Sequence, residues 1–150
     1  MDWKGIRLED FTESAFTPVT PEEFVGIRIN APEMAGSGAA PFAVSGTLTL
    51  PAERVYRIDN VRYAVVLVAV DLTRHRAFAH NLIHPGRSVD RVRPSPRKDP
   101  DWMENHYISR FFAVNLPEYV QNLPREKAEY LVYAVLEEHM SNVVRVRYDP

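Results

Sequence analysis

The sequence contains no cysteine among its 150 residues. Disulfide bonds, thiolate zinc sites, iron–sulfur clusters and cysteine nucleophiles are therefore excluded. The longest apolar run, Ala64 to Val70, is far shorter than the roughly 20 residues that a membrane-spanning helix needs. The net charge is −2, so the chain as a whole lacks the positive charge with which proteins bind nucleic acid. We therefore expect a soluble protein that neither spans a membrane nor binds nucleic acid.

The sequence also lacks the motifs of common catalytic and nucleotide-binding sites. It has no G-x-S-x-G nucleophile motif and neither of the glycine-rich phosphate-binding motifs, G-x-x-x-x-G-K-[ST] and G-x-G-x-x-G. The acidic pairs Glu22-Glu23 and Glu137-Glu138 are adjacent in sequence, and adjacent side chains of a strand point to opposite faces. The sequence therefore predicts no enzyme active site and no cofactor.

No secretory signal is predicted at the start of the chain, because MDWKGIRLEDFTES does not combine a positive segment with an apolar run. The sequence does not determine the compartment, and the cytoplasm is expected only if no leader has been removed. If a leader has been removed, the protein is expected outside the cytoplasm, in the periplasm or secreted.

The composition is that of one globular domain, with 45% hydrophobic and 25% charged residues. Residues 1–23 lack a sustained period and are interpreted as an N-terminal arm or edge segment. Residues 24–150 form the predicted domain. Within it, residues 85–106 carry four prolines and many charges, and they are predicted to form a long loop.

Seven segments have the alternation or the β-branched composition of strands: 24–29, 42–50, 61–72, 78–84, 107–116 and two within 129–148. In 42–50, one face is apolar and the other carries Ser45, Thr47 and Thr49, as in an antiparallel strand with one face in water. Segment 61–72 is apolar on both faces, which is typical of a central strand or of one covered on both sides. The predicted fold class is an all-β, antiparallel Greek-key sandwich.

One segment fits two structures. Ala128, Leu131, Val132, Val135 and Leu136 follow the spacing of an amphipathic helix, so the fold would be α+β if 124–140 were helical. Strand is favoured because residues 130–135 are rich in tyrosine and valine. A hairpin would also give the last strand, 141–148, an immediate neighbour.

The segments Leu123-Pro and Tyr130-Leu-Val-Tyr-Ala-Val resemble the penultimate strand of immunoglobulin-like and fibronectin type III-like sandwiches, and Ser141-Asn-Val-Val-Arg-Val resembles the closing strand of bacterial sandwich modules. The resemblance covers residues 24–148. It implies a seven-stranded sandwich and a tyrosine, here Tyr130, whose hydroxyl turns back onto the upstream backbone. The Cys–Trp–Cys core of antibody domains is absent. The superfamily includes many functions, so the resemblance implies a fold and no specific activity.

The loop 85–106 is the best candidate for function. Its candidate partner-binding residues are Arg91, Arg93, Arg97, Trp102 and Met103. Arginine and tryptophan dominate interface hot spots, and an exposed tryptophan is costly to leave in water. Acidic residues are interleaved with the arginines, which argues against a polyanion groove. The sequence thus favours a non-catalytic module that binds a protein or a glycan partner.

Two alternatives remain open. His80 and His84 share a face of a predicted strand and could present two imidazoles to one metal ion, although surface histidines are the commoner case. The other alternative is a structural domain, in which the N-terminal arm or another edge strand pairs with a second copy of the chain to form a homo-oligomer.

Overall fold

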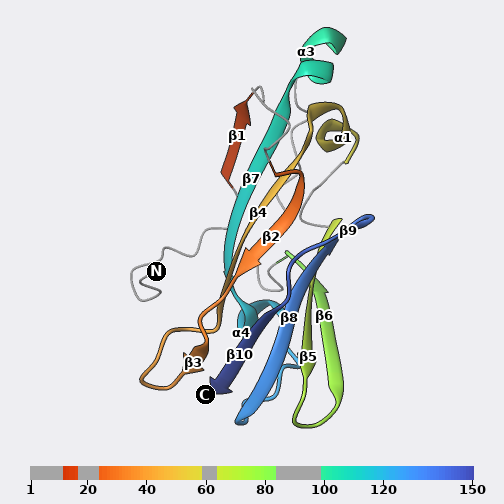
Figure 1. Ribbon diagram of the computed structural model, residues 1–150. Helices are drawn as coiled ribbons and strands as arrows, with labels where there is room; N and C mark the ends of the chain where they lie inside the picture. The colour runs from red at the N-terminus through yellow and green to blue at the C-terminus, as the bar shows by residue number, and fades with distance from the viewer. Residues whose placement is uncertain (1–11, 17–23, 59–63, 84–98) are drawn as a thin grey trace.

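The computed structural model describes residues 12–16, 24–58, 64–83 and 99–150, with the backbone alone described for 12–16. These residues form two β-sheets (Figure 1). The first sheet has the order β1 (Thr12–Phe16), β7 (Tyr107–Asn115), β4 (Ala43–Pro51) and β2 (Gly26–Asn30). The second has the order β3 (Met34–Gly36), β10 (Val144–Asp149), β8 (Ala128–Leu136), β5 (Val65–Asp71) and β6 (Arg76–Asn81), with β9 (His139–Met140) beside β8.

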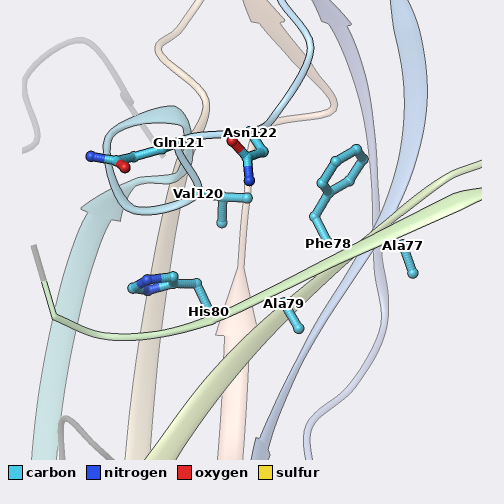
Figure 2. A pocket seen from close by; sticks show the side chains of 7 residues that line it. All are labelled: Ala77, Phe78, Ala79, His80, Val120, Gln121 and Asn122. Carbon is cyan, nitrogen blue, oxygen red and sulfur yellow. The ribbon is translucent and has the colours of Figure 1, made fainter. Parts of the chain in front are cut away.

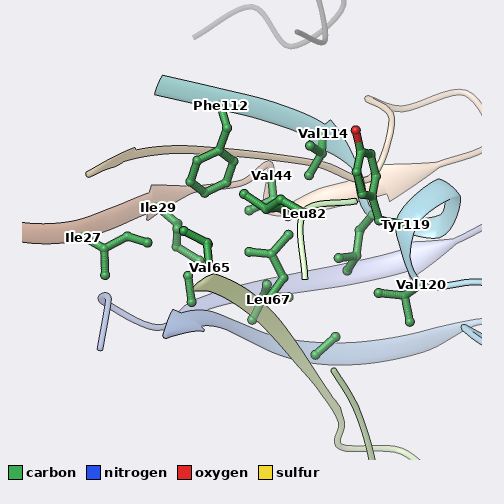
Figure 3. Close-up of a cluster of buried hydrophobic side chains, with 14 of the residues drawn as sticks. Ile27, Ile29, Val44, Val65, Leu67, Leu82, Phe112, Val114, Tyr119 and Val120 are labelled. Atoms are coloured by element: carbon green, nitrogen blue, oxygen red, sulfur yellow. The ribbon is translucent and has the colours of Figure 1, made fainter. Parts of the chain in front are cut away.

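The hydrophobic core lies between the two sheets (Figure 3). Alternate residues of β4 and β7 supply one side of it, and alternate residues of β5 and β8 supply the other. Fully buried examples are Val44, Leu48, Leu67 and Val132. At the centre of the first sheet, Gly46 lies directly opposite Phe112, and its missing side chain leaves room for the Phe112 ring. Successive side chains of a strand point to opposite faces, so the apolar side chains two residues apart lie on the same face of each sheet.

Within the described residues, three short helices accompany the sheets: α1 (Ala52–Arg57), α3 (Pro100–Asn105) and α4 (Leu116–Tyr119). The first two lie side by side at one end of the molecule (Figure 1). The third directly follows β7, and its Leu116 and Tyr119 are buried in the core. No helix in the described residues is long and apolar enough to cross a membrane.

The prediction of a β-rich fold is confirmed, and the helical alternative for 124–140 is wrong. Ala128–Leu136 is strand β8, and its residues alternate between buried and half-buried along the whole length. A strand with apolar residues on both faces also satisfies the i, i+3, i+4 spacing, which explains the ambiguity in the sequence. The prediction that 61–72 contains a central strand is also confirmed, because β5 lies between β8 and β6.

Several details of the prediction need correction. Besides the seven expected strands, the chain forms the short strands β1, β3 and β9. The pairing of β3 with β10 is parallel, so the fold is not purely antiparallel. Residues 12–16, within the segment predicted as an N-terminal arm or edge segment, form β1 at the edge of the first sheet beside β7. These three strands are two to five residues long and carry too little alternation to be read from sequence.

The hairpin between β5 and β6 is built on a buried aspartate. One carboxylate oxygen of Asp71 accepts hydrogen bonds from the backbone N–H groups of Thr73 and Arg74, at 2.9 and 3.0 Å. Burial acts to raise the pKa of the Asp71 carboxyl, but these hydrogen bonds and the nearby Arg74 guanidinium outweigh it and hold the pKa below its ordinary value. The turn thereby fixes where β6 begins.

Candidate functional site

The loop 85–106 is described only from Asp99 onward, and Arg91, Arg93 and Arg97 lie outside the described residues. Its described end is helical, which corrects the prediction of a continuous loop. The Asp99 side chain accepts a hydrogen bond from the backbone N–H of Asp101 at 3.0 Å, and Pro100 occupies the first turn of α3. An aspartate cap followed by proline is a common way for a helix to begin.

Trp102 and Met103 pack against the edge of the core. The indole of Trp102 stacks on the His106 ring, with centroids 4.1 Å apart and planes at 13°, and it also approaches the Tyr56 ring of α1. The His106 Nδ1 is 2.7 Å from the Trp102 carbonyl oxygen. Both predicted anchors are thus half-buried within their own chain. Their predicted contact with a partner remains a prediction.

The histidine pair proposed for metal binding is described only in part, since His84 lies outside the described residues. His80 is on β6, and its Nδ1 is 2.7 Å from the carbonyl oxygen of Asn81. Within residues 12–16, 24–58, 64–83 and 99–150, no group of three or more His, Cys, Asp or Glu side chains is arranged to hold a metal ion. The hypothesis that His80 and His84 bind a metal ion stays a prediction, because His84 is not described.

The second sheet turns an apolar surface away from the core. The strand register aligns Asn81, Val66, Val135 and Met140 in one row across the sheet, and Ala79, Val68 and Tyr133 in the next. A third row contains Ala77, Val70, Leu131 and Arg145. We call the apolar members of these rows the apolar face: Val66, Val68, Val70, Ala77, Ala79, Leu131, Tyr133, Val135 and Met140. Ala77, Ala79 and Met140 are exposed, Met140 to 63%, and the other members are half-buried.

Several charged residues beside the apolar face form ion pairs. Arg145 Nε lies 2.6 Å from a Glu129 carboxylate oxygen, and Arg74 bridges Asp71 and Glu126. These pairs leave the apolar face with a charged rim of both signs and no charge inside it. An apolar centre with a polar rim is the usual composition of a protein-binding surface.

The edge strand β6 exposes part of its backbone beside this face. Successive residues of β5 bond alternately to β8 and to β6. The Leu72 N–H, just after β5, donates to the Glu129 carbonyl oxygen of β8. This bond determines which residues of β5 bond to β6. The pairs of Phe78 with Ala69 and of His80 with Leu67 are therefore the hydrogen-bonded ones. It follows that the N–H and C=O groups of Ala77 and Ala79 point away from β5.

A pocket of about 380 Å³ lies along the same edge (Figure 2). Residues 77–80 of β6 form one wall, and Val120, Gln121 and Asn122, which follow α4, form the other. We call it the edge pocket. Its polar groups are the His80 imidazole and the amides of Gln121 and Asn122, and no acidic or basic side chain other than His80 lines it. Because a carbonyl can only accept, the contact with Asn81 places a proton on His80 Nδ1 and leaves Nε2 of the neutral ring as an acceptor.

A second, shallower hollow of about 360 Å³ lies on the first sheet. Its polar lining comes from Arg28, Asn30, Ser45 and Thr47, and the ring of Phe111 beside them is 42% exposed. We call it the first-sheet hollow. A ring next to several hydrogen-bonding side chains can accept a polar ligand with an apolar side.

Comparison of the chain with models of known protein families, with curated proteins and with solved structures found no match. The proposed function therefore rests on the surfaces of the protein itself. The sequence did contain a signal for the apolar face, because segment 61–72 is apolar on both sides. The edge pocket had no such signal, since Gln121 and Asn122 are distant in sequence from β6 and are ordinary loop residues.

Proposed function

We propose that the protein is a non-catalytic module with an immunoglobulin-like fold that binds a partner protein through the apolar face. The observation that carries the proposal is the uninterrupted set of apolar side chains across β6, β5 and β8. The predicted contact through Arg91, Arg93 and Arg97 stays a prediction, because those residues are not described.

The strand pairing supports the immunoglobulin-like part of the proposal. In such sandwiches the first, second and fifth of the lettered strands share one sheet, and the third, sixth and seventh share the other. The order β2-β4-β7 in the first sheet and β5-β8-β10 in the second fits this arrangement, with β6 as the added strand beside the third. The expected hydrogen bond of Tyr130 does not fit, because its buried hydroxyl has no partner in the described residues.

The size of the apolar face supports binding to a protein. Three strands about 4.8 Å apart, each contributing about five residues at 3.3 Å, cover roughly 240 Å². A contiguous apolar patch of that size approaches the largest patch on a typical soluble protein, which is often functional. Valine, leucine and tyrosine side chains on a sheet also lose little conformational freedom when they are covered.

Photo-cross-linking tests the proposal. A photoreactive phenylalanine analogue replaces Tyr133 on the apolar face in one variant and Phe111 in the first-sheet hollow in a matched control. In the producing cells we expect a discrete protein adduct from position 133 and none from position 111. Adding Val68→Lys should abolish that adduct. A folded variant that gives no adduct at 133, or gives the same adduct at 111, would refute the assignment.

Glycan binding is the second candidate, and the first-sheet hollow favours it. The exposed Phe111 ring could cover the apolar side of a sugar, while Arg28, Asn30 and Thr47 offer hydrogen bonds. A glycan array probed with the protein and with Phe111→Ala separates the two candidates. Binding that depends on Phe111 and is unaffected by Val68→Lys would favour a glycan.

A further inference from the structure

The edges of the two sheets are protected unequally. On β2, the Asn142 side chain occupies the edge, because its Oδ1 accepts from the Ile29 N–H and its Nδ2 donates to the Ile29 carbonyl oxygen, both at 2.9 Å. On β3, the Gly36 N–H donates to the Ala40 carbonyl oxygen. These contacts use backbone groups that would otherwise attract another strand.

The edge of β6 has no comparable protection from the described residues. The outward N–H and C=O groups of Ala77 and Ala79 have no strand beyond them in the sheet order. Their side chains are methyl groups, which do not hinder an approaching backbone. The strand carries no proline or lysine, the residues that often guard an edge, and Arg76 stands only at its beginning.

We infer that β6 binds an extended segment of the partner protein by strand addition, with one polar uncharged side chain of that segment in the edge pocket. This inference rests on the proposed function and gives its mode of binding. An antiparallel strand would exchange hydrogen bonds with Ala77 and Ala79, because opposing residues in such pairs bond through both backbone groups. The Asn81 carbonyl is already occupied by His80 Nδ1, so the ladder ends there.

The register determines the chemistry of the added segment. Its residues opposite Ala77 and Ala79 would lie on the same face as those alanines and extend the apolar face, so they should be apolar. The residue opposite His80 would point towards the core side and enter the edge pocket. There it would meet an imidazole acceptor and two amides, which suit the donor and acceptor of an asparagine or glutamine side chain.

A synthetic peptide with this pattern, acetyl-SNVTVS-amide, tests the inference on the full chain. In the antiparallel register its asparagine faces His80 and its valines face Ala79 and Ala77. We expect it to shift the backbone amide NMR signals of Ala77 and Ala79 in a saturable way. A matched peptide with both valines N-methylated cannot donate these hydrogen bonds, and it should bind at least about tenfold more weakly.

Ala79→Pro is the companion protein variant. It removes an N–H that points away from β5, so the ladder between β5 and β6 keeps its bonds. We expect a similar tenfold weakening of peptide binding. If this variant does not fold, the N-methylated peptide still decides the question on the unmodified protein.

Three results would overturn the inference. They are equal binding of the N-methylated peptide, shifts confined to the first sheet, and no saturable shift at about 5 mM peptide, where even a weak millimolar complex would be seen. A dimer that Ala79→Pro dissolves would assign the edge to a second copy and also overturn it. If the adduct from position 133 persists while the peptide fails to bind, the apolar face keeps its proposed function and strand addition alone is refuted.

Discussion

Replacing Tyr130 with phenylalanine should stabilise the protein. The Tyr130 side chain is fully buried in β8, with its ring centroid 5.6 Å from that of Phe42 and 6.3 Å from that of Tyr148. Its hydroxyl has no hydrogen-bond partner in the described residues. Burial and then the negative charge of Asp71 raise the pKa of the phenol, as expected for a hydroxyl in an apolar site.

The magnitude follows from two opposing effects. An unpaired buried hydroxyl costs about 1–3 kcal/mol in proteins, and Tyr130→Phe removes that cost. The space left by one oxygen is smaller than that left by a methyl group, so its cost is below about 1 kcal/mol. We therefore expect the free energy of unfolding to rise by about 1 kcal/mol, which corresponds to a rise in Tm of about 2–4 °C for a chain of this size.

Urea denaturation with an unchanged m-value measures the effect. Tyr148→Phe is the matched control, because Tyr148 packs in the same group of rings at the border of the core and is 7% exposed. Its free energy of unfolding should change by less than about 0.5 kcal/mol. If Tyr130→Phe instead destabilises the protein by more than about 1 kcal/mol, the hydroxyl is hydrogen-bonded, as the immunoglobulin-like resemblance implied.

Three further substitutions test the fold. Folding lowers the pKa of Asp71, so its contribution to stability is present above about pH 3.8 and is lost as the pH falls through the folded pKa. Between pH 6 and pH 2.5, the urea midpoint should therefore fall less in Asp71→Asn than in the parent. Gly46→Ala should cost about 1–3 kcal/mol by urea denaturation, because the added carbon would meet the Phe112 ring at 2.2 Å, whereas Ser45→Ala should be nearly neutral. Asn142→Ala should cost about 1–3 kcal/mol and promote aggregation measured by light scattering, because it uncovers the edge of β2; an unchanged parent-like value would contradict that role.

The seven strands that could be predicted from the sequence are those with alternating apolar and polar residues, or with β-branched residues, over five or more positions. β4 and β7 have an apolar face long enough to show period-two burial, and β5 shows its central place by being apolar on both sides. α1 was not predicted, because six residues that begin after Pro51 resemble a turn as much as a helix. β3 was missed for a related reason, since its pairing depends on β10 and hardly on its own three residues.

The candidate site was less predictable than the fold. Trp102 was predicted to contact a partner, but the rings of Tyr56 and His106 approach it within its own chain, and neither contact can be inferred from spacing in the sequence. The edge pocket depends on where the chain passes after α4, which tertiary packing decides. The apolar outward residues of β5 were visible in the sequence, and the structure adds that they are half-buried.

One partner could use the apolar face and the adjacent edge of β6 together. A specific interface buries about 800 Å² on each partner, and the apolar face offers less than half of that area. A partner that rested on the face alone would therefore bind weakly. A strand added at β6 would bring main-chain hydrogen bonds from Ala77 and Ala79, fill the edge pocket and extend the apolar face by one strand width of about 4.8 Å. Backbone bonds would then supply affinity, while the alternation of apolar and polar side chains in the added strand would supply specificity.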